Sequence, residues 1–409
     1  VSVLAFFLQK IKLYSMKYLF KSILFKSTFL FWLAILSLTS ASCQKKITVS
    51  AANVDAYIPF LKQKKVGIVA HQASVISSSK NTIHLVDMLR KNDITIQKVF
   101  APEHGFRGTA DAGEKIENQI DPKTQLPIIS LYGKNRKPRK EQLKDIEIMV
   151  FDIQDVGVRF YTYLSSLHNV MEACAENNIP LIVLDRPNPN VHYIDGPVLN
   201  LEHKSFVGMH PVPIVYGMTI GEYAQMINGE KWLANSIKCD LTVIPLQNYN
   251  HLTTYELKVR PSPNLPNKQS IALYPSLCLL EPTEISIGRG TDLQFQVYGH
   301  PKFPKTDFSY VPKSNFGSKN PKYKGKICFG ENLTSVNPPS KIELKWLLNA
   351  YLSFPEKNSF FLKGFERISG VSSLRKQIID GANEKTIRDS WTDGLNEFKK
   401  IRRKYLLYP

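Results

Sequence analysis

The sequence predicts an α/β protein in which a doubly wound parallel sheet is followed by a second, smaller and less regular α/β domain. From about Lys65 onward, short β-rich runs alternate with helical patterns, which is the order of elements that builds a parallel sheet. The runs are also apolar throughout, as expected for strands that helices cover on both faces. A chain of 409 residues is long enough for two such domains.

The first domain is predicted between residues 43 and 235. Its strands are the runs KVGIVA, ITIQKVFA, IEIMVFDI and IPLIVLD, which begin at residues 65, 94, 146 and 179. The helical patterns between and after these strands are NTIHLVDMLRKN, KEQLKD, YLSSLHNVMEACAENN and TIGEYAQMINGEKWL. The last pattern opens with Thr219 and has Glu222 three residues later, which is the spacing of a capping box at the start of a helix.

The second domain is predicted from residue 236 to residue 409. DLTVIPLQNY is predicted to be a strand, and RPSPNLPNKQSIALYPS is a proline-rich loop that leads into a helix or turn. ISIGRGTDLQFQVYGHP has the pattern of a strand, a turn and a second strand. KIELKWLLNAYLSF and WTDGLNEFKKIRRKYLLY are predicted to be helices.

Residues 1–42 are predicted to be a targeting segment that truly starts at Met16. Three lysines precede an apolar core over residues 29–38, and small residues lead up to Cys43. The sequence just before Cys43 resembles a bacterial lipoprotein cleavage site, although Ser40 stands where such sites usually have leucine. The apolar core is short for crossing a membrane. We therefore expect an exported periplasmic or outer-membrane lipoprotein of a bacterium, anchored through a lipidated Cys43, with a secreted form as the alternative.

The composition limits the kinds of partner. The net charge is +18, and five of the lysines that contribute to it lie before residue 43. Such a charge suits an acidic polymer or an anionic lipid surface. No nucleic-acid-binding motif accompanies it, so we expect no nucleic-acid partner. The later cysteines lack CxxC spacing, which predicts buried free thiols rather than a zinc site or a redox pair. They are Cys174, Cys239, Cys278 and Cys328.

Polar side chains gather at the predicted carboxyl ends of four strands, the edge of a parallel sheet where ligands bind. In strand order they are His71 and Gln72, then Glu103, His104 and Arg107, then Asp152, Gln154, Asp155, Arg159, Tyr161 and Tyr163, then Asp185, Arg186 and Asn188. Any one of them could simply cap a helix or hold a turn. Because four strand ends in succession carry polar side chains, we favour a shared polar site. Later motifs add His210, Tyr216, Arg260, Asn264, Glu281, Glu284 and Arg289.

The residue types at these ends indicate hydrolytic chemistry. The dinucleotide motif GxGxxG, the phosphate-binding GxxxxGK[ST], the GxSxG elbow and HExxH are all absent. No histidine pair has the spacing of metal ligands on one helix, so we expect neither a metal nor a cofactor. Carboxylates protonate leaving groups and activate water in glycoside hydrolysis, and arginines bind anionic groups. The site therefore favours a hydrolase that acts on an acidic carbohydrate.

Seven motifs in order, APEHGFRG, FDIQDVGVRFYTY, LDRPNP, GMTIGE, PSPNLP, IGRGTD and RRKYLLYP, resemble the NamZ-type exo-β-N-acetylmuramidases. The resemblance covers about residues 50 to 409. It implies removal of N-acetylmuramic acid from the non-reducing end of peptidoglycan fragments, by cleavage of a β-1,4 bond to N-acetylglucosamine. Peptidoglycan-derived disaccharides and muropeptides would be the partners. The resemblance also implies a Rossmann-like domain, a second α/β domain, and an active site in the cleft between them.

Carried over by motif, Glu103 of PEHG is the expected catalytic acid. For the second carboxylate the resemblance leaves alternatives open: Asp152 and Asp155 first, then Asp185, Glu284 and Glu172. One departure is Pro282, which stands where many relatives have glycine and affects the pose expected for Glu281. Two other classes stay open, namely a non-catalytic exported carbohydrate-binding lipoprotein and a metal-dependent deacetylase or esterase.

Overall fold

The structure is a computed structural model that describes residues 46–77, 81–103, 105–107 and 119–409. The predicted targeting segment, its cleavage site at Cys43, and the candidate His104 lie outside the described residues. Within the described ranges, no helix is both long enough and apolar enough to cross a membrane.

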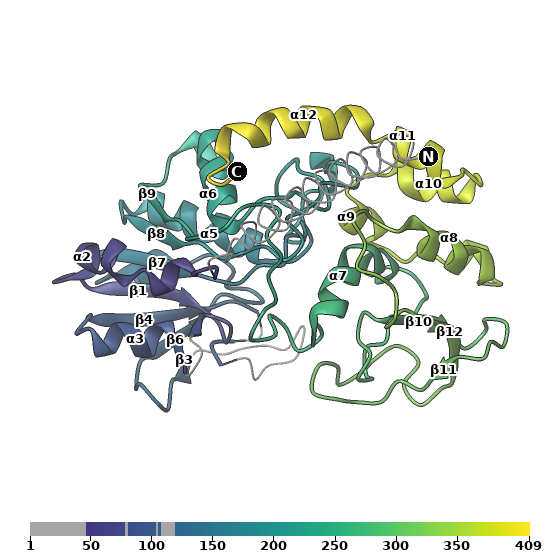
Figure 1. Cartoon of the computed structure of the whole chain (residues 1–409), viewed down its shortest axis with the longest axis horizontal. Helices are drawn as coiled ribbons and strands as arrows, with labels where there is room; N and C mark the ends of the chain where they lie inside the picture. Colours follow the sequence, from purple (N-terminus) through teal and green to yellow (C-terminus); the bar gives the residue numbers. More distant parts are fainter. Residues whose placement is uncertain (1–45, 78–80, 104, 108–118) are drawn as a thin grey trace, which may run out of the picture. The chain divides into compact units, whose positions relative to one another are not determined.

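A seven-stranded sheet forms the centre of the larger part of the fold (Figure 1). In pairing order its strands are β5 (Gln119–Ile120), β6 (Pro127–Ser130), β4 (Ile96–Ala101), β1 (Val66–Ala70), β7 (Ile148–Asp152), β8 (Leu181–Leu184) and β9 (Leu241–Ile244). Strand β5 pairs antiparallel with β6, and the other neighbours pair in parallel. Numbered along the chain, the parallel strands run 3-2-1-4-5-6, so the strand order reverses between β1 and β7. The predicted doubly wound sheet is confirmed.

Two hydrophobic cores cover the two faces of this sheet. On one face, Ile68 of β1 packs with α2 (Ile58–Leu61) and α3 (Leu85–Lys91). On the other face, its neighbour Val69 packs with α5 (Tyr163–Glu176) and α6 (Ile220–Gly229). Successive strand residues point to opposite faces. Because both faces are covered, every residue of β1 is buried, which explains why the strand runs are apolar throughout.

Three shorter elements complete this part, namely the hairpin of β2 (Val75–Ser77) and β3 (Thr82–His84), and α4 (Lys140–Leu143). The capping box predicted for α6 is present, since the Thr219 side chain accepts from Glu222 N and the Glu222 side chain accepts from Thr219 N. The four later cysteines are free and buried, as predicted.

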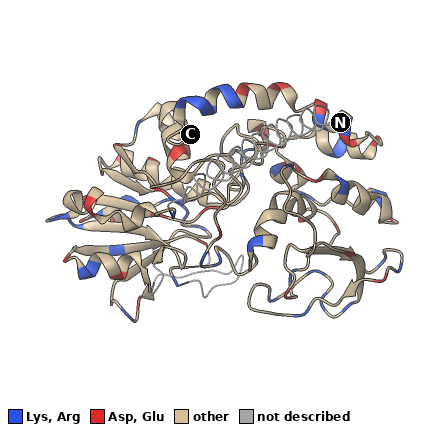
Figure 2. Ribbon diagram, viewed as in Figure 1, with Lys and Arg blue, Asp and Glu red and all other residues tan. Residues whose placement is uncertain are grey.

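The smaller part of the fold contains a three-stranded antiparallel sheet in the order β10 (Val297–His300), β12 (Cys328–Asn332), β11 (Ser309–Tyr310). Its helices are α7 (Lys268–Leu277), α8 (Leu344–Ser353), α9 (Phe365–Ser369), α10 (Ser373–Ile379), α11 (Glu384–Asp389) and α12 (Thr392–Arg402). Helix α12 has Asp393 in its first turn and lysines and an arginine in its last turn (Figure 2). This arrangement complements the helix dipole, so part of the basic charge stabilises a helix end.

Two segments differ from the predicted pattern. The expected first strand of the strand–turn–strand unit is only a bridge between Ser286 and Gly299. The turn that follows has Gly288 and Gly290 at positive φ, and the backbone leaves the extended conformation there. Strand β9 pairs with β8, so the large sheet extends to residue 244, beyond the change in pattern near residue 235.

Candidate active site

A pocket lies where the carboxyl ends of the large sheet meet the smaller part of the fold. Its lining residues are Glu103, Phe160, Tyr161, Thr162, Tyr163, Ser262, Asn264, Leu265, Tyr274, Arg289 and Phe295. It has an empty volume of about 460 Å³, solvent at its mouth included. Five of the residues predicted from the sequence thus line one pocket: Glu103, Tyr161, Tyr163, Asn264 and Arg289.

Glu103 follows β4 and is held by hydroxyl groups from two other elements. Thr162 Oγ1 donates to Glu103 Oε2 over 3.2 Å. The Tyr132 hydroxyl, just after β6, also hydrogen-bonds to the Glu103 carboxyl. Burial, and then the charge of Glu103, raise the pKa of Tyr132 to about 12. Tyr132 therefore stays protonated at neutral pH and acts as a donor to Glu103.

Tyr163 is oriented by a buried histidine. Gln154 N–H donates to His71 Nε2 over 2.9 Å, so in the neutral ring the proton resides on Nδ1. Nδ1 lies 3.2 Å from the Tyr163 hydroxyl and donates to it. The Tyr163 hydroxyl in turn lies 3.2 Å from the carbonyl of Pro261, to which it donates. This chain connects the ends of β1 and β7 to the PSPNLP loop and fixes one wall of the pocket.

Asp155 lies beneath the pocket rather than in its lining. Its Oδ2 accepts from Gly157 N over 2.7 Å and from the Tyr216 hydroxyl. Its Oδ1 is buried and has no hydrogen-bond partner within the described ranges. Burial raises the pKa of Asp155 to about 6. The carboxyl group also raises the pKa of Tyr163, so it belongs to the layer that supports the pocket tyrosines.

One buried polar atom of the pocket, Asn264 Oδ1, lacks a hydrogen-bond partner within the described part of the chain. The Tyr161 hydroxyl, by contrast, hydrogen-bonds to that of Tyr163. Buried polar groups in native proteins are almost always hydrogen-bonded, and an unpaired one costs about 1–3 kcal/mol. A polar ligand that donates to Asn264 Oδ1 would satisfy this atom.

Arg289 supplies the positive charge of the pocket. Its Nε and Nη2 donate to the two carboxylate oxygens of Glu281 over 2.8 and 3.3 Å, and its guanidinium lies 5.0 Å from the centroid of the Phe295 ring. Burial alone would raise the pKa of Glu281, but the charge and hydrogen bonds of Arg289 outweigh burial and hold that pKa below its usual value. Nη1 makes no hydrogen bond to any residue that the structure describes, so it remains available to an anionic ligand group.

Three other arginines predicted as candidates have structural partners outside the pocket. Arg186 makes a bidentate, buried ion pair with Asp152, with Nε–Oδ1 and Nη2–Oδ2 distances of 2.6 and 2.8 Å. Arg107 makes a similar pair with Asp121. Arg159 is buried and donates to the carbonyls of Pro197, Val212, Ile368 and Ser369. The structure thus gives each of these arginines a structural partner.

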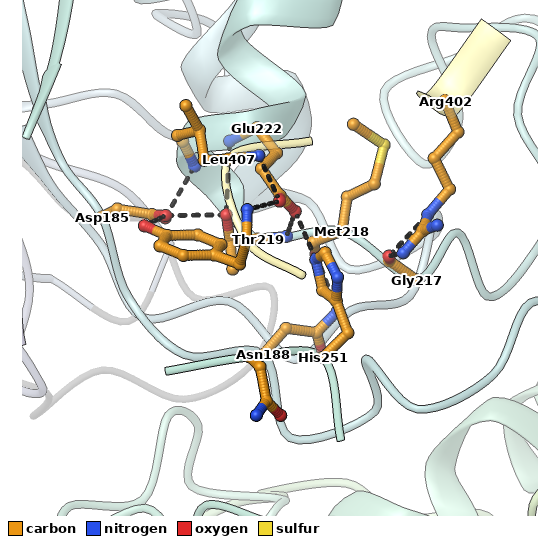
Figure 3. Close-up of polar contacts among 12 residues, drawn as sticks. Asp185, Asn188, Gly217, Met218, Thr219, Glu222, His251, Arg402 and Leu407 are labelled. Carbon is orange, nitrogen blue, oxygen red and sulfur yellow. Dashed lines mark hydrogen bonds and ion pairs between the residues drawn. The ribbon is translucent and has the colours of Figure 1, made fainter. Parts of the chain in front are cut away.

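The remaining candidates also serve the fold. Asp185 accepts from the Thr219 and Tyr408 hydroxyls (Figure 3). The others are Glu172 bound to Lys137, Asn188 to Met218, His210 to His168, Tyr216 to Asp155, Glu284 to Tyr323, and Gln72 to Pro261. Within the described ranges, no group of three or more His, Cys, Asp or Glu side chains is arranged to hold a metal ion.

The structure adds pocket residues that the sequence reasoning missed. They are Phe160, Thr162, Ser262, Leu265, Tyr274 and Phe295 in the lining, and Tyr132 beside Glu103. Thr162 stands between two predicted tyrosines, so the FYTY motif itself contained the signal. Tyr132 follows β6, and the strand-end rule would have found it if β6 had been recognised as a strand.

A doubly wound sheet whose strand ends deliver a carboxyl group and aromatic hydroxyls to a pocket, which an arginine of the smaller part of the fold completes, defines an α/β protein that can bind a polar, anionic small molecule. Residues 66–269 match the model of the N-terminal domain of the exo-beta-N-acetylmuramidase NamZ, and residues 272–408 match that of its C-terminal domain. The chain belongs to the NamZ exo-beta-N-acetylmuramidase family.

A named relative and two solved structures agree with this membership. The chain is 39% identical over 371 residues to the peptidoglycan beta-N-acetylmuramidase NamZ of Bacillus subtilis, covering 85% of this chain and 88% of that protein. A crystal structure of a DUF1343 family protein from Bacteroides fragilis is 43% identical with a TM-score of 0.82, and covers 89% of this chain and 99% of that one. A second protein of that family from the same organism is 28% identical with a TM-score of 0.76 and the same coverage.

Proposed function

We propose that the protein is an exo-acting glycoside hydrolase that releases N-acetylmuramic acid from the non-reducing end of peptidoglycan fragments. One observation carries the proposal: Glu103 and Arg289 line the same pocket in a member of a muramidase family. The name of the Bacillus subtilis relative, a peptidoglycan beta-N-acetylmuramidase, supports the substrate class.

In this proposal the chemistry requires a proton donor and an anion-binding group on the same sugar. Glu103 protonates the glycosidic oxygen as the bond from C1 of muramic acid to N-acetylglucosamine breaks. A water molecule supplies the hydroxyl group that replaces it at C1 and the proton that restores Glu103. Arg289 binds the lactyl carboxylate, the group that distinguishes muramic acid from N-acetylglucosamine, through its Nη1. The unpaired Asn264 Oδ1 accepts from the acetamido N–H or a ring hydroxyl of the sugar.

A disaccharide assay tests the proposal against its two rivals. The purified protein is incubated with synthetic N-acetylmuramyl-β-1,4-N-acetylglucosamine, with and without EDTA. We expect both free sugars to be released at equal rates and no effect of the chelator. Binding without release would identify a carbohydrate-binding protein. Release of acetate in place of sugar, abolished by EDTA, would identify a metal-dependent deacetylase.

We also propose that the protein is exported and anchored through a lipid on Cys43. The basic, apolar and small-residue regions that precede this cysteine support the proposal. Labelling cells with an alkyne-bearing fatty acid tests it, because the wild-type chain should incorporate the label and Cys43→Ser should not. Equal labelling of both chains, or of neither, would contradict lipidation at Cys43.

A further inference from the structure

An exposed aromatic side chain stands at the tip of a rigid turn. Asn315 and Ser318 exchange backbone hydrogen bonds over 3.0 and 3.2 Å, and Asn315 Oδ1 accepts from Gly317 N and Ser318 N. Between them, Phe316 remains 50% exposed. The turn therefore presents a large apolar ring to solvent on a backbone that is held by four hydrogen bonds.

This turn is fastened to two walls of the pocket. Asn264, which lines the pocket, donates from Nδ2 to Gly317 O over 2.6 Å. Asn315 Nδ2 donates to Thr291 O over 3.0 Å, two residues after Arg289. A Cβ atom on Gly317 would lie 2.9 Å from Asn264 Oδ1, so the two segments approach closely. Phe316 is not itself among the lining residues, so these contacts place the turn that carries it at the rim of the pocket.

The Phe316 ring contacts the cationic side chain of Arg260 on one side. The guanidinium of Arg260 lies 5.1 Å from the centroid of the Phe316 ring, within the range of a cation–π contact. The carbonyl of Arg260 accepts from Gln72 Nε2 over 3.3 Å, which ties this residue to the end of β1. Arg260 is itself exposed, and half of Phe316 is exposed beside it.

We propose that Phe316 and Arg260 form the subsite for the sugar on the leaving side of the scissile bond. The inference rests on the proposed function, in which Glu103 and Arg289 hold the muramic acid inside the pocket. An exo-acting enzyme keeps one terminal sugar enclosed, and the next ring extends from Glu103 toward the rim. The C–H face of that N-acetylglucosamine packs on the Phe316 ring, and Arg260 donates to its hydroxyl or acetamido oxygens.

Product inhibition and disaccharide turnover test the subsite directly. For wild type, Phe316→Ala, Phe316→Trp and Arg260→Ala, one measures kcat/KM on the disaccharide and the inhibition constants of free N-acetylglucosamine and free N-acetylmuramic acid. We expect Phe316→Ala to lower kcat/KM about 2- to 12-fold and to weaken inhibition by N-acetylglucosamine by a similar factor. Inhibition by N-acetylmuramic acid should stay unchanged, and Phe316→Trp should retain the wild-type values.

The matched control is Phe60→Ala on α2, where the phenylalanine is 56% exposed and lies before the start of β1. This variant should behave as wild type in every measurement. Unchanged N-acetylglucosamine inhibition in Phe316→Ala, or equal weakening for both sugars, would overturn the subsite. If the wild-type protein releases no muramic acid at all, the proposed function fails instead, so the two failures are distinguishable.

Discussion

Arg289 is the arginine that lines the pocket, and two of its nitrogens already hold Glu281. If Nη1 binds the lactyl carboxylate, the enzyme should prefer a muramic acid to an N-acetylglucosamine at the non-reducing position. A charge-assisted bond contributes about 2–3 kcal/mol, which corresponds to about 30- to 150-fold in kcat/KM. We predict that Arg289→Ala loses most of this preference, measured as the ratio of kcat/KM on the disaccharide to that on chitobiose.

Removing Arg289 also leaves Glu281 without its main partner, so stability must be measured beside the rates. Glu281→Gln is the control, because it keeps the arginine and removes the carboxylate charge. That variant should keep the preference for muramic acid. A preference that survives Arg289→Ala in a folded protein would show that another group binds the carboxylate.

The sequence could not tell which arginine binds the lactyl carboxylate, because the roles of the candidates depend on partners distant in the chain. Those candidates are Arg107, Arg159, Arg186 and Arg289. Arg186 meets Asp152 and Arg159 meets carbonyls near residue 368 only after the chain has folded. The side-chain types that suit a ligand also suit a buried ion pair. The place of Glu103 in the pocket lining was predictable, because a strand end and a proline-containing motif locate it without knowledge of its partners.

Helices α5 and α6 are joined by a buried chain of polar side chains. His168 Nδ1 lies 2.9 Å from His210 Nε2, and His210 Nδ1 lies 3.0 Å from the Tyr223 hydroxyl. Burial lowers the pKa of His168 from 6.5 to about 4, although Glu172 opposes part of this effect. Between pH 6.5 and pH 4 the unfolded chain therefore binds a proton at His168 that the folded chain does not. Stability contributed by this residue is present above pH 6.5 and is lost as pH falls through that window.

We predict that the free energy of unfolding of wild type falls by about 2 kcal/mol more than that of His168→Gln when the pH is lowered from 7.5 to 5, because the glutamine side chain does not titrate. Urea unfolding of both chains at both pH values measures the difference. The buried Asp155 and Asp185, with pKa values raised by burial to about 6, act in the opposite direction but are common to both chains. His192→Gln, which changes an exposed histidine, serves as the control. The same loss in wild type and His168→Gln would contradict the assignment.

The sequence predicted the strands that are long and apolar but missed a short one. Strands β1, β4, β7 and β8 were recognised from their runs, and the strand ends then located Glu103. Strand β6 has four residues, begins with Pro127 and was missed, and Tyr132 was missed with it. The helices between residues 365 and 389 are at most seven residues long, too short for helical periodicity to identify them.

Across the whole molecule, the end of the chain returns to the large sheet and binds two buried carboxylates (Figure 3). The Tyr408 hydroxyl donates to Asp185 Oδ2 over 2.6 Å and accepts from Leu246 N over 2.8 Å. Glu222 Oε1 accepts from Leu407 N over 2.9 Å, and Glu222 Oε2 lies 3.0 Å from His251 Nε2. The last residues therefore fasten α12 to the loops after β8 and β9.

We predict that Tyr408→Phe lowers the free energy of unfolding by about 1–3 kcal/mol. The change leaves the buried N–H group of Leu246 without an acceptor and removes a donor from the buried carboxylate of Asp185. Thermal and urea unfolding measure the effect. Tyr405→Phe, which removes a hydroxyl bonded to the less buried Glu230, should cost less. Equal stability of Tyr408→Phe and wild type would show that the C-terminal contacts do not hold the two parts of the fold together.

The measurement that tests the central claim most directly is the turnover of Glu103→Gln on two substrates. Glutamine keeps the shape of the side chain and the hydrogen bond from Thr162 but has no proton to transfer. On the natural disaccharide, kcat should fall about 10²- to 10⁴-fold while the protein stays folded. On an aryl muramide, whose leaving group needs no proton, the loss should be far smaller. Near-normal turnover of Glu103→Gln on the disaccharide would contradict the account and leave PEHG as a structural turn.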